Sequence, residues 1–186
     1  MKLSIVLSTH AAQFDAVALK GDLERNLARI AAWGYDGVEL AIRDPSLVDA
    51  TALERAVASH GLTVPAIGTG QAWSEEGLSL TSDRPGVRAA AIERIKSHIP
   101  LAARLDAIII LGLIRGLTPK GQTQAQSMAY LVAALQACSE AALAVGVRYA
   151  LEPLNRYETD LVQTAGEGLA LIREVSFPNF GLLLDT

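Results

Sequence analysis

The chain of 186 residues contains a single cysteine, Cys138, which excludes a disulfide within the chain and is typical of a reducing compartment. It has no run of about 18 apolar residues, so we expect no membrane-spanning helix and no membrane partner. The first apolar run, Leu3 to Leu7, is shorter than the roughly 7–15 residues of a signal-peptide core. We therefore expect a cytoplasmic protein.

Clustered basic residues are also absent. Lysine and arginine number 16 against 20 aspartates and glutamates, giving a net charge of −4. Because nucleic-acid binding normally needs a basic surface, we expect no nucleic-acid partner. No G-x-G-x-x-G sequence follows the first apolar run and no Walker sequence occurs, which lowers the odds of a nucleotide-binding fold. Apolar residues make up 51%, enough for the core of one domain spanning residues 1–186.

Short apolar runs alternate along the chain with longer amphipathic patterns. The runs are residues 3–8, 36–40, 62–70, 107–112, 147–153 and 180–185. Pro65, inside the third run, indicates an irregular or edge position. Between residues 128 and 145 apolar side chains recur at every third or fourth position, which predicts a helix. Strand–helix alternation of this kind predicts parallel strands joined by helical crossovers.

Two architectures fit this pattern, an open doubly wound sheet or part of a (β/α)₈ TIM barrel. The distribution of polar residues separates them, because these residues gather where the runs end. They are Thr9, His10, Glu39, Thr69, Gln71, Arg115, Glu152 and Asp185. In a (β/α)₈ barrel the carboxyl ends of all strands form the active face, whereas an open sheet gathers its ligands near one switch point. The pattern favours the barrel.

Three stretches resemble a known family: "DGVEL" (36–40), "EPLNRYE" (152–158) and the terminal "GLLLDT" (181–186). They are similar to the xylose isomerase-like TIM barrels, and more narrowly to the sugar phosphate isomerase/epimerase branch that includes the ketose 3-epimerases. The resemblance covers essentially the whole chain. It implies a (β/α)₈ barrel of which this chain holds six βα units, cut after strand six.

The resemblance implies a metal site. Glu152 and Asp185 would bind one divalent ion, Mn²⁺, Co²⁺ or Mg²⁺ with Zn²⁺ as an alternative, and a histidine and a glutamate from strands seven and eight would complete the set. Carboxylates on adjacent parallel strands, about 5 Å apart, are able to converge on one hard cation. From position alone, Glu152 is equally explained by an ion pair with Arg148 or Arg156, and Asp185 by a strand-end cap.

The reaction implied by the resemblance is isomerisation or epimerisation of a ketose or sugar phosphate. A proton moves next to the carbonyl through a metal-stabilised enediolate, and Glu152 acts as ligand and as acid/base.

Further residues are assigned to a small-molecule sugar: Glu158, Glu39, His10, Trp73 and Arg115. Each has a structural alternative. For the two acids, Glu158 would pair with Arg156, and the charge of Glu39 would be balanced by Arg43 or by hydrogen bonds from backbone amides. His10 would be a polar cap and Trp73 would pack in a loop. Arg115 would form a surface salt bridge.

Two other interpretations stay open. One is a family-two AP endonuclease-like protein, but that zinc chemistry needs several histidines, and of the three here His60 and His98 fall in helical segments away from the strand ends. The other is a catalytically incomplete fragment. Six βα units leave free sheet edges at the first and sixth strands, which invite pairing, so we expect a homo-oligomer, a dimer or tetramer. On this interpretation the 186-residue chain alone has no epimerase activity.

Overall fold

A single parallel β-sheet organises the computed structural model, which describes residues 1–12 and 17–185. The strand order is β2-β1-β3-β4-β5-β6-β7, and every neighbouring pair is parallel. The strands are β1 Ser4–Ser8, β2 Leu19–Lys20, β3 Gly37–Ala41, β4 Ala66–Gly68, β5 Ile108–Leu111, β6 Tyr149–Leu151 and β7 Phe180–Leu182. Parallel strands that follow one another in chain order from β3 to β7, joined by helices, confirm the predicted α/β fold of the TIM-barrel type.

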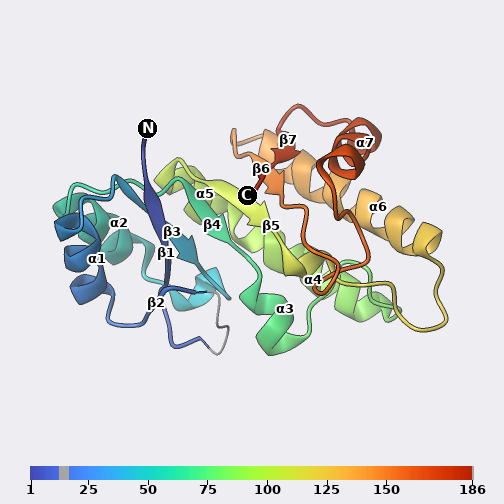
Figure 1. The fold of residues 1–186 in the computed structure, drawn as a ribbon, viewed down its shortest axis with the longest axis horizontal. Coiled ribbons are helices and arrows are strands. Elements are labelled where there is room, and N and C mark those ends of the chain that lie inside the picture. The colour runs from blue at the N-terminus through green and yellow to red at the C-terminus, as the bar shows by residue number, and fades with distance from the viewer. Residues whose placement is uncertain (13–16, 186) are drawn as a thin grey trace.

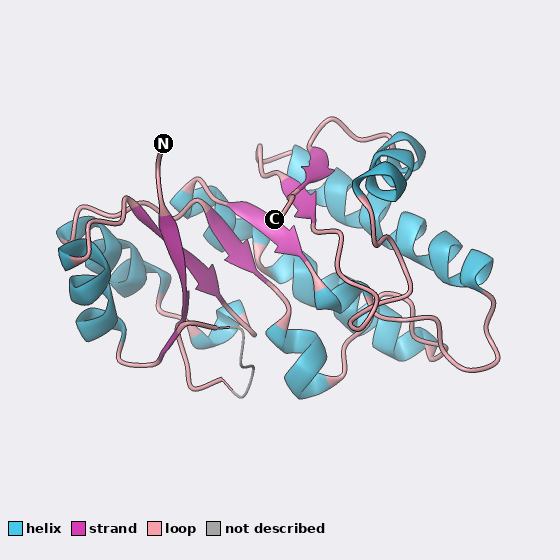
Figure 2. Ribbon diagram, in the orientation of Figure 1, coloured by secondary structure: helices cyan, strands magenta, loops and turns pink. Residues whose placement is uncertain are grey.

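Helices connect the strands and lie behind the sheet and at both of its ends (Figure 2). They are α1 Leu23–Ala32, α2 Ala50–Ser59, α3 Gln71–Glu76, α4 Pro85–Ser97, α5 Ile99–Leu105, α6 Gln124–Leu143 and α7 Ala165–Val175, with short 3₁₀ turns η1 Pro45–Leu47 and η2 Leu113–Arg115. In Figure 1, α1 and α2 lie beside β1 and β3, whereas α6 and α7 lie beside β6 and β7. Within the described residues, every helix is too short or too polar to cross a lipid bilayer.

The predicted number of strands was one too few. The additional strand, β2, pairs in parallel with the carboxyl end of β1, with Leu7 opposite Leu19 and Ser8 opposite Lys20. The predicted free edge at the first strand is therefore wrong along this part of β1. A strand of two residues is too short to produce a hydrophobic period, which is why the sequence pattern did not indicate it.

Of the two positions predicted for Pro65, the irregular one is confirmed and the edge position is wrong, because Pro65 lies in an irregular segment next to a central strand. Only residues 66–68 of the predicted third run form a strand, and β4 lies at the centre of the sheet. Pro65 directly precedes β4, and its carbonyl accepts a hydrogen bond from the Ile108 amide at 3.1 Å. A proline lacks the amide donor but keeps the acceptor, so it is tolerated at the first position of a central strand.

The helix predicted from the longest segment with a helical repeat of apolar residues is present in the structure. The middle of the predicted stripe is buried on α6, with Leu131, Leu135 and Cys138 all at 0% exposure, but α6 ends at Leu143 and the predicted Val145 lies beyond it and is exposed. A capping box at Thr164 begins α7. Asp49 caps α2 by accepting from the amides of Thr51 and Ala52.

Candidate active site

A pocket of about 500 Å³ opens at the carboxyl ends of the strands. Its walls come mainly from one face of the sheet, because the register places Val6 opposite Glu39, and Gly68 opposite both Ala41 and Ile110. Alternate residues of a strand share a face, so the same face continues beyond the strand ends. The lining residues are Val6, Val17, Glu39, Ala41, Gly68, Thr69, Gly70, Gln71, Ile110, Gly112, Leu113, Glu152, Leu154, Glu158, Leu183, Leu184 and Asp185.

The acidic residues of the pocket are Glu39, Glu152, Glu158 and Asp185. Glu152 directly follows β6, and the adjacent strand β7 leads to Asp185. The prediction that Asp185 ends a strand is wrong by three residues, because β7 ends at Leu182. The structure nevertheless brings the two carboxylates into one pocket at the same end of the sheet.

Two glycines make room for two of these carboxylates. A Cβ atom added to Gly68 on β4 would lie 3.6 Å from Oε1 of Glu39, and one added to Gly112 after β5 would lie 3.4 Å from Oε2 of Glu152. Each glutamate therefore leans over the glycine of the neighbouring strand. Because β4 and β5 are adjacent, Glu39 and Glu152 lean toward the middle of the pocket from opposite sides.

Burial and mutual repulsion raise the pKa of both glutamates. For Glu39, desolvation is the largest cause, followed by the negative charges of Glu152 and Asp185. For Glu152, desolvation again comes first and Asp185 second, while Arg115 acts in the opposite direction. Like charges that lie close together in a partly desolvated site are costly unless a cation offsets them.

This donor set fits a hard divalent cation. Carboxylate oxygens are the ligands that Mg²⁺ and Mn²⁺ prefer. Among residues 1–12 and 17–185, neither Glu39 nor Glu152 forms an ion pair with a lysine or arginine. The described residues contain no group of three or more His, Cys, Asp or Glu side chains already arranged around one metal position. The pocket thus offers carboxylates but no preformed cage.

The alternative partners predicted for these acids are engaged elsewhere. Arg43 pairs with Glu75 at 3.0 Å and with Glu76 at 3.2 Å, not with Glu39. Glu158 accepts a hydrogen bond from the Asn155 side chain. Arg156, the predicted partner of Glu158, instead lies over the ring of Tyr157.

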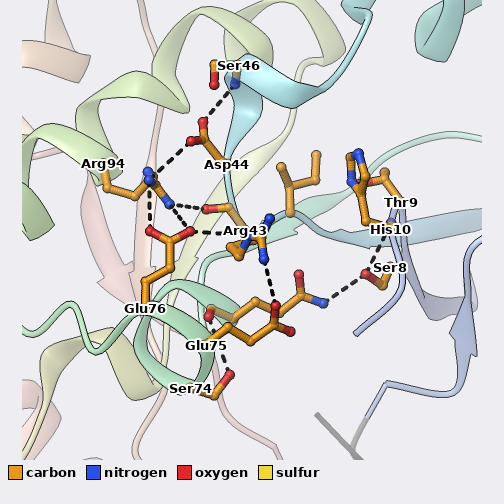
Figure 3. Close-up of polar contacts among 12 residues, drawn as sticks. Ser8, Thr9, His10, Arg43, Asp44, Ser46, Ser74, Glu75, Glu76 and Arg94 are labelled. Carbon is orange, nitrogen blue, oxygen red and sulfur yellow. Dashed lines mark hydrogen bonds and ion pairs between the residues drawn. The ribbon is translucent and has the colours of Figure 1, made fainter. Parts of the chain in front are cut away.

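An ion-pair network holds one side of the pocket (Figure 3). Arg94 on α4 bonds to Asp44 at 3.1 Å and to Glu76 on α3 at 3.0 Å, and it donates to the carbonyl of Arg43. The segment after β3 is thereby tied to both α3 and α4. Since α3 begins at Gln71, the network fixes a residue that lines the pocket.

Gln71 is a site residue that sequence reasoning saw only as one polar residue among several. It is 4% exposed, lines the pocket and donates from Nε2 to the hydroxyl of Ser8 at 2.8 Å. Thr69 also lines the pocket, but its hydroxyl is bound to the Ile110 carbonyl at 2.8 Å. The sequence "TGQ" directly after a strand was the available signal, but only the buried hydrogen bond to Ser8 on β1 distinguishes Gln71 from its neighbours.

Three residues assigned to the sugar lie outside the pocket lining. His10 is exposed and pairs with the Thr9 hydroxyl beside β1 (Figure 3). Trp73 is on α3 and packs against the hydrophobic core. Arg115 is fully buried and donates to backbone carbonyls, so the alternative of a surface salt bridge is wrong.

Known proteins of similar sequence share this arrangement of strands. An L-ribulose 3-epimerase of Mesorhizobium japonicum (strain LMG 29417 / CECT 9101 / MAFF 303099) is 32% identical over 97% of this chain and 60% of its own length. A ketose 3-epimerase of Arthrobacter globiformis is 30% identical over 93% of this chain and 58% of its own length. A solved structure of L-ribulose 3-epimerase superposes with a TM-score of 0.78 at 31% identity, covering 98% of this chain and 60% of that protein.

The chain thus spans about 60% of the length of the curated relatives it matches. Residues 27–186, which include all four acids of the pocket, match a family described as Xylose isomerase-like TIM barrel. That match extends over most of the chain and agrees with the parallel sheet. The chain therefore belongs to the xylose isomerase-like TIM barrel family.

Proposed function

We propose that this chain forms the main part of a divalent-metal-dependent sugar epimerase that moves a proton next to the carbonyl of a ketose. The observation that supports this most strongly is the meeting of Glu152 and Asp185 in one pocket, in a chain related to proteins named ketose 3-epimerases. The pocket volume, about 500 Å³, lies in the range of small-molecule sites.

Glu152 and Asp185 would hold the metal, Mn²⁺, Co²⁺ or Mg²⁺. When bound, the ion would supply positive charge beside the carbonyl oxygen of the sugar, where negative charge develops. Repulsion from Asp185 is the second largest cause of the raised pKa of Glu152. In this proposal, a cation bound between the two carboxylates would offset that repulsion.

Glu152 is the proposed acid/base. Its carboxylate takes the proton from the carbon next to the carbonyl; the electrons of the broken C–H bond move onto the carbonyl oxygen and leave an enediolate. A proton delivered to the opposite face of the same carbon gives the epimer, and one delivered to the neighbouring carbon gives the isomer.

The remaining pocket residues would bind and enclose the sugar. Glu158 and Glu39 offer carboxylate oxygens to sugar hydroxyl groups, and Gln71 offers an amide held by Ser8. Leu113 and Leu154 present apolar surface to the C–H groups and exclude water.

We favour a neutral ketose over a sugar phosphate. The described lining of the pocket contains four carboxylates and no lysine, arginine or histidine. A phosphate in that setting would meet four carboxylates and no cationic side chain among the described lining residues. Arg115, assigned to substrate binding from the sequence, has its guanidinium bound to backbone carbonyls instead.

AP endonuclease chemistry is not supported by the histidines. His10 is exposed, His60 pairs with Glu24 at 3.2 Å on the surface, and His98 is fully buried. None of the three is among the residues that line the pocket.

The test is an epimerase assay of the complete gene product on D-fructose, D-psicose, D-tagatose and L-ribulose with Mn²⁺ or Co²⁺. We expect Glu152→Gln to lower kcat by roughly 10²–10⁴-fold without loss of the fold, since it removes the proton-transfer group. Glu140→Gln, an exposed carboxylate on α6, is the matched control and should leave kcat unchanged. Full activity of Glu152→Gln, or no turnover of any ketose by the unchanged protein, would contradict the proposal.

The 186-residue chain by itself should give no turnover, because the family resemblance assigns two further metal ligands to positions outside it. Turnover by the isolated chain would show that this part of the proposal is wrong.

A further inference from the structure

Arg115 joins two loops that are distant in sequence. Its side chain is at 0% exposure, and its Nε donates to the carbonyl of Gly112 at 3.1 Å while Nη2 donates to that of Leu111 at 3.4 Å. Nη1 donates to the carbonyls of Leu161 at 3.3 Å and Val162 at 3.1 Å. One guanidinium therefore links the end of β5 to the loop after β6.

The charge of Arg115 is retained despite its burial. Desolvation lowers the pKa of the guanidinium to about 10, which still leaves it protonated at neutral pH. The carboxylates of Glu152 and Glu158 favour the charged form from a distance. A lysine at this position could not reproduce the contacts, because its single ammonium lacks the fork that reaches carbonyls on both segments.

The loop that Arg115 holds contains an unusual backbone conformation. Val162 has a φ of +58°, in the left-handed region that a β-branched residue rarely adopts. Its carbonyl is one of those bound by Arg115, and its side chain is buried. Such a conformation persists only when its surroundings hold it, and the guanidinium is the polar part of those surroundings.

Other contacts bind the same two segments together near Glu158. The Thr159 hydroxyl donates to the carbonyl of Gly116 at 3.0 Å, and the Thr118 amide donates to the Asp160 carboxylate at 2.9 Å. Glu158 lies directly before this anchored stretch, and its side chain lines the pocket. Its place at the pocket depends on where the loop is held.

We propose that Arg115 is a positioning residue, which fixes the loop after β6 against the end of β5 and so places the Glu158 carboxylate in the pocket. The part of this proposal that concerns substrate binding rests on the proposed function. The part that concerns the loop does not.

Hydrogen–deuterium exchange tests the loop directly. In Arg115→Met we expect the amides of residues 158–163 to exchange about tenfold faster or more. The amides of α7 should exchange faster only to the extent that the free energy of unfolding of the whole protein has fallen. Arg88→Met is the matched control, since Arg88 also donates to a backbone carbonyl, that of Ser82, but away from the pocket. Equal exchange of the loop in the two variants would overturn the proposal.

Arg115→Lys keeps the charge and serves if Arg115→Met does not fold. We expect its loop to exchange faster than that of the unchanged protein, and an unchanged loop would again contradict the positioning role.

A double-mutant cycle with Glu158→Gln tests the link to substrate in the complete gene product. If Arg115 acts through Glu158, Arg115→Lys should raise KM in the unchanged background and have little further effect on KM beside Glu158→Gln. Additive effects would show that Arg115 does not act through Glu158. If the protein has no epimerase activity, the proposed function fails, but the hydrogen–deuterium exchange experiment still tests whether Arg115 holds the loop. The failure of one proposal can therefore be told apart from the failure of the other.

Discussion

At the scale of single residues, the acids of the pocket are arranged at a cost to stability. Glu39 is half-buried, and its pKa is raised by desolvation and by the charges of Glu152 and Asp185. No lysine or arginine within the described residues pairs with it. Groups held in an unfavourable environment are typical of functional sites, where stability is given up for chemistry.

Glu39→Gln should therefore stabilise the metal-free protein. Removing one of three neighbouring negative charges is expected to raise the Tm by about 2–4 °C, the shift that roughly 1 kcal/mol gives in a chain of this size. Differential scanning calorimetry at pH 7 measures this, with Glu140→Gln as the control. A lower Tm for Glu39→Gln would mean that its carboxylate makes a favourable interaction in the folded protein.

Gly116 is required by close packing as well as by its backbone conformation. Its φ is +87°, and an added Cβ would lie 1.9 Å from Oγ of Ser79. Gly121 has the same φ of +87° but nothing within 4 Å of that position. The ψ of Gly116 is −161°, in a backbone region that is essentially restricted to glycine, so its backbone and the clash both penalise a side chain there.

We expect Gly121→Ala to lower the free energy of unfolding by roughly 1–2 kcal/mol, the cost of the left-handed region. Gly116→Ala should cost about 1–3 kcal/mol more because of overpacking and because its backbone lies in a region essentially restricted to glycine. Urea denaturation of both variants measures the difference. Equal losses would contradict both reasons.

At the scale of elements, the long periodic segments were predictable and the short ones were not. The stripe on α6 and the capping box of α7 follow from local sequence alone. The two-residue strand β2 and the six-residue helix α3 depend on partners brought by the rest of the fold. Trp73 was expected in a loop for this reason, whereas it packs on the core from α3.

His98 lies at the junction of α4 and α5 and connects these helices to the end of β3. It is fully buried, with Nδ1 2.8 Å from the Arg94 carbonyl and Nε2 3.0 Å from the Ile42 carbonyl. Sequence reasoning placed it away from the strand ends, facing solvent or between helices. Pro100 occupies the first turn of α5, where its missing amide donor is tolerated.

This histidine should make stability depend on pH. Burial lowers the pKa of His98 below its ordinary value of 6.5. The hydrogen bonds to the carbonyls of Ile42 and Arg94 and the charge of Asp44 oppose this shift, whereas the charge of the Arg94 guanidinium adds to it. Below pH 6.5 the unfolded chain binds a proton that the folded chain does not, so the free energy of unfolding falls as the pH decreases.

His98→Gln should reduce that slope between pH 6.5 and about pH 5, measured by urea denaturation at several pH values. His60→Gln is the control, because His60 is on the surface and pairs with Glu24. If His98→Gln keeps the slope of the unchanged protein, His98 is not the group responsible.

At the scale of the whole molecule, parallel strands in chain order bring residues far apart in sequence to one pocket. Glu39 and Asp185 are separated by most of the chain, yet the order β3-β4-β5-β6-β7 places both at the same end of the sheet. The family motifs predicted the positions of Glu152, Glu158 and Asp185 in this pocket. They did not predict that Arg115 is bound by carbonyls, because that depends on how two loops meet.

The most direct measurement is Mn²⁺ binding, followed by electron paramagnetic resonance, in four forms of the complete gene product: unchanged, Glu152→Gln, Asp185→Asn and Glu140→Gln. The account predicts one tight site in the unchanged protein and in Glu140→Gln. It predicts binding weaker by about a hundredfold or more in the two pocket variants, since each loses a ligand. The same Kd in all four proteins would contradict the claim that Glu152 and Asp185 hold a metal ion.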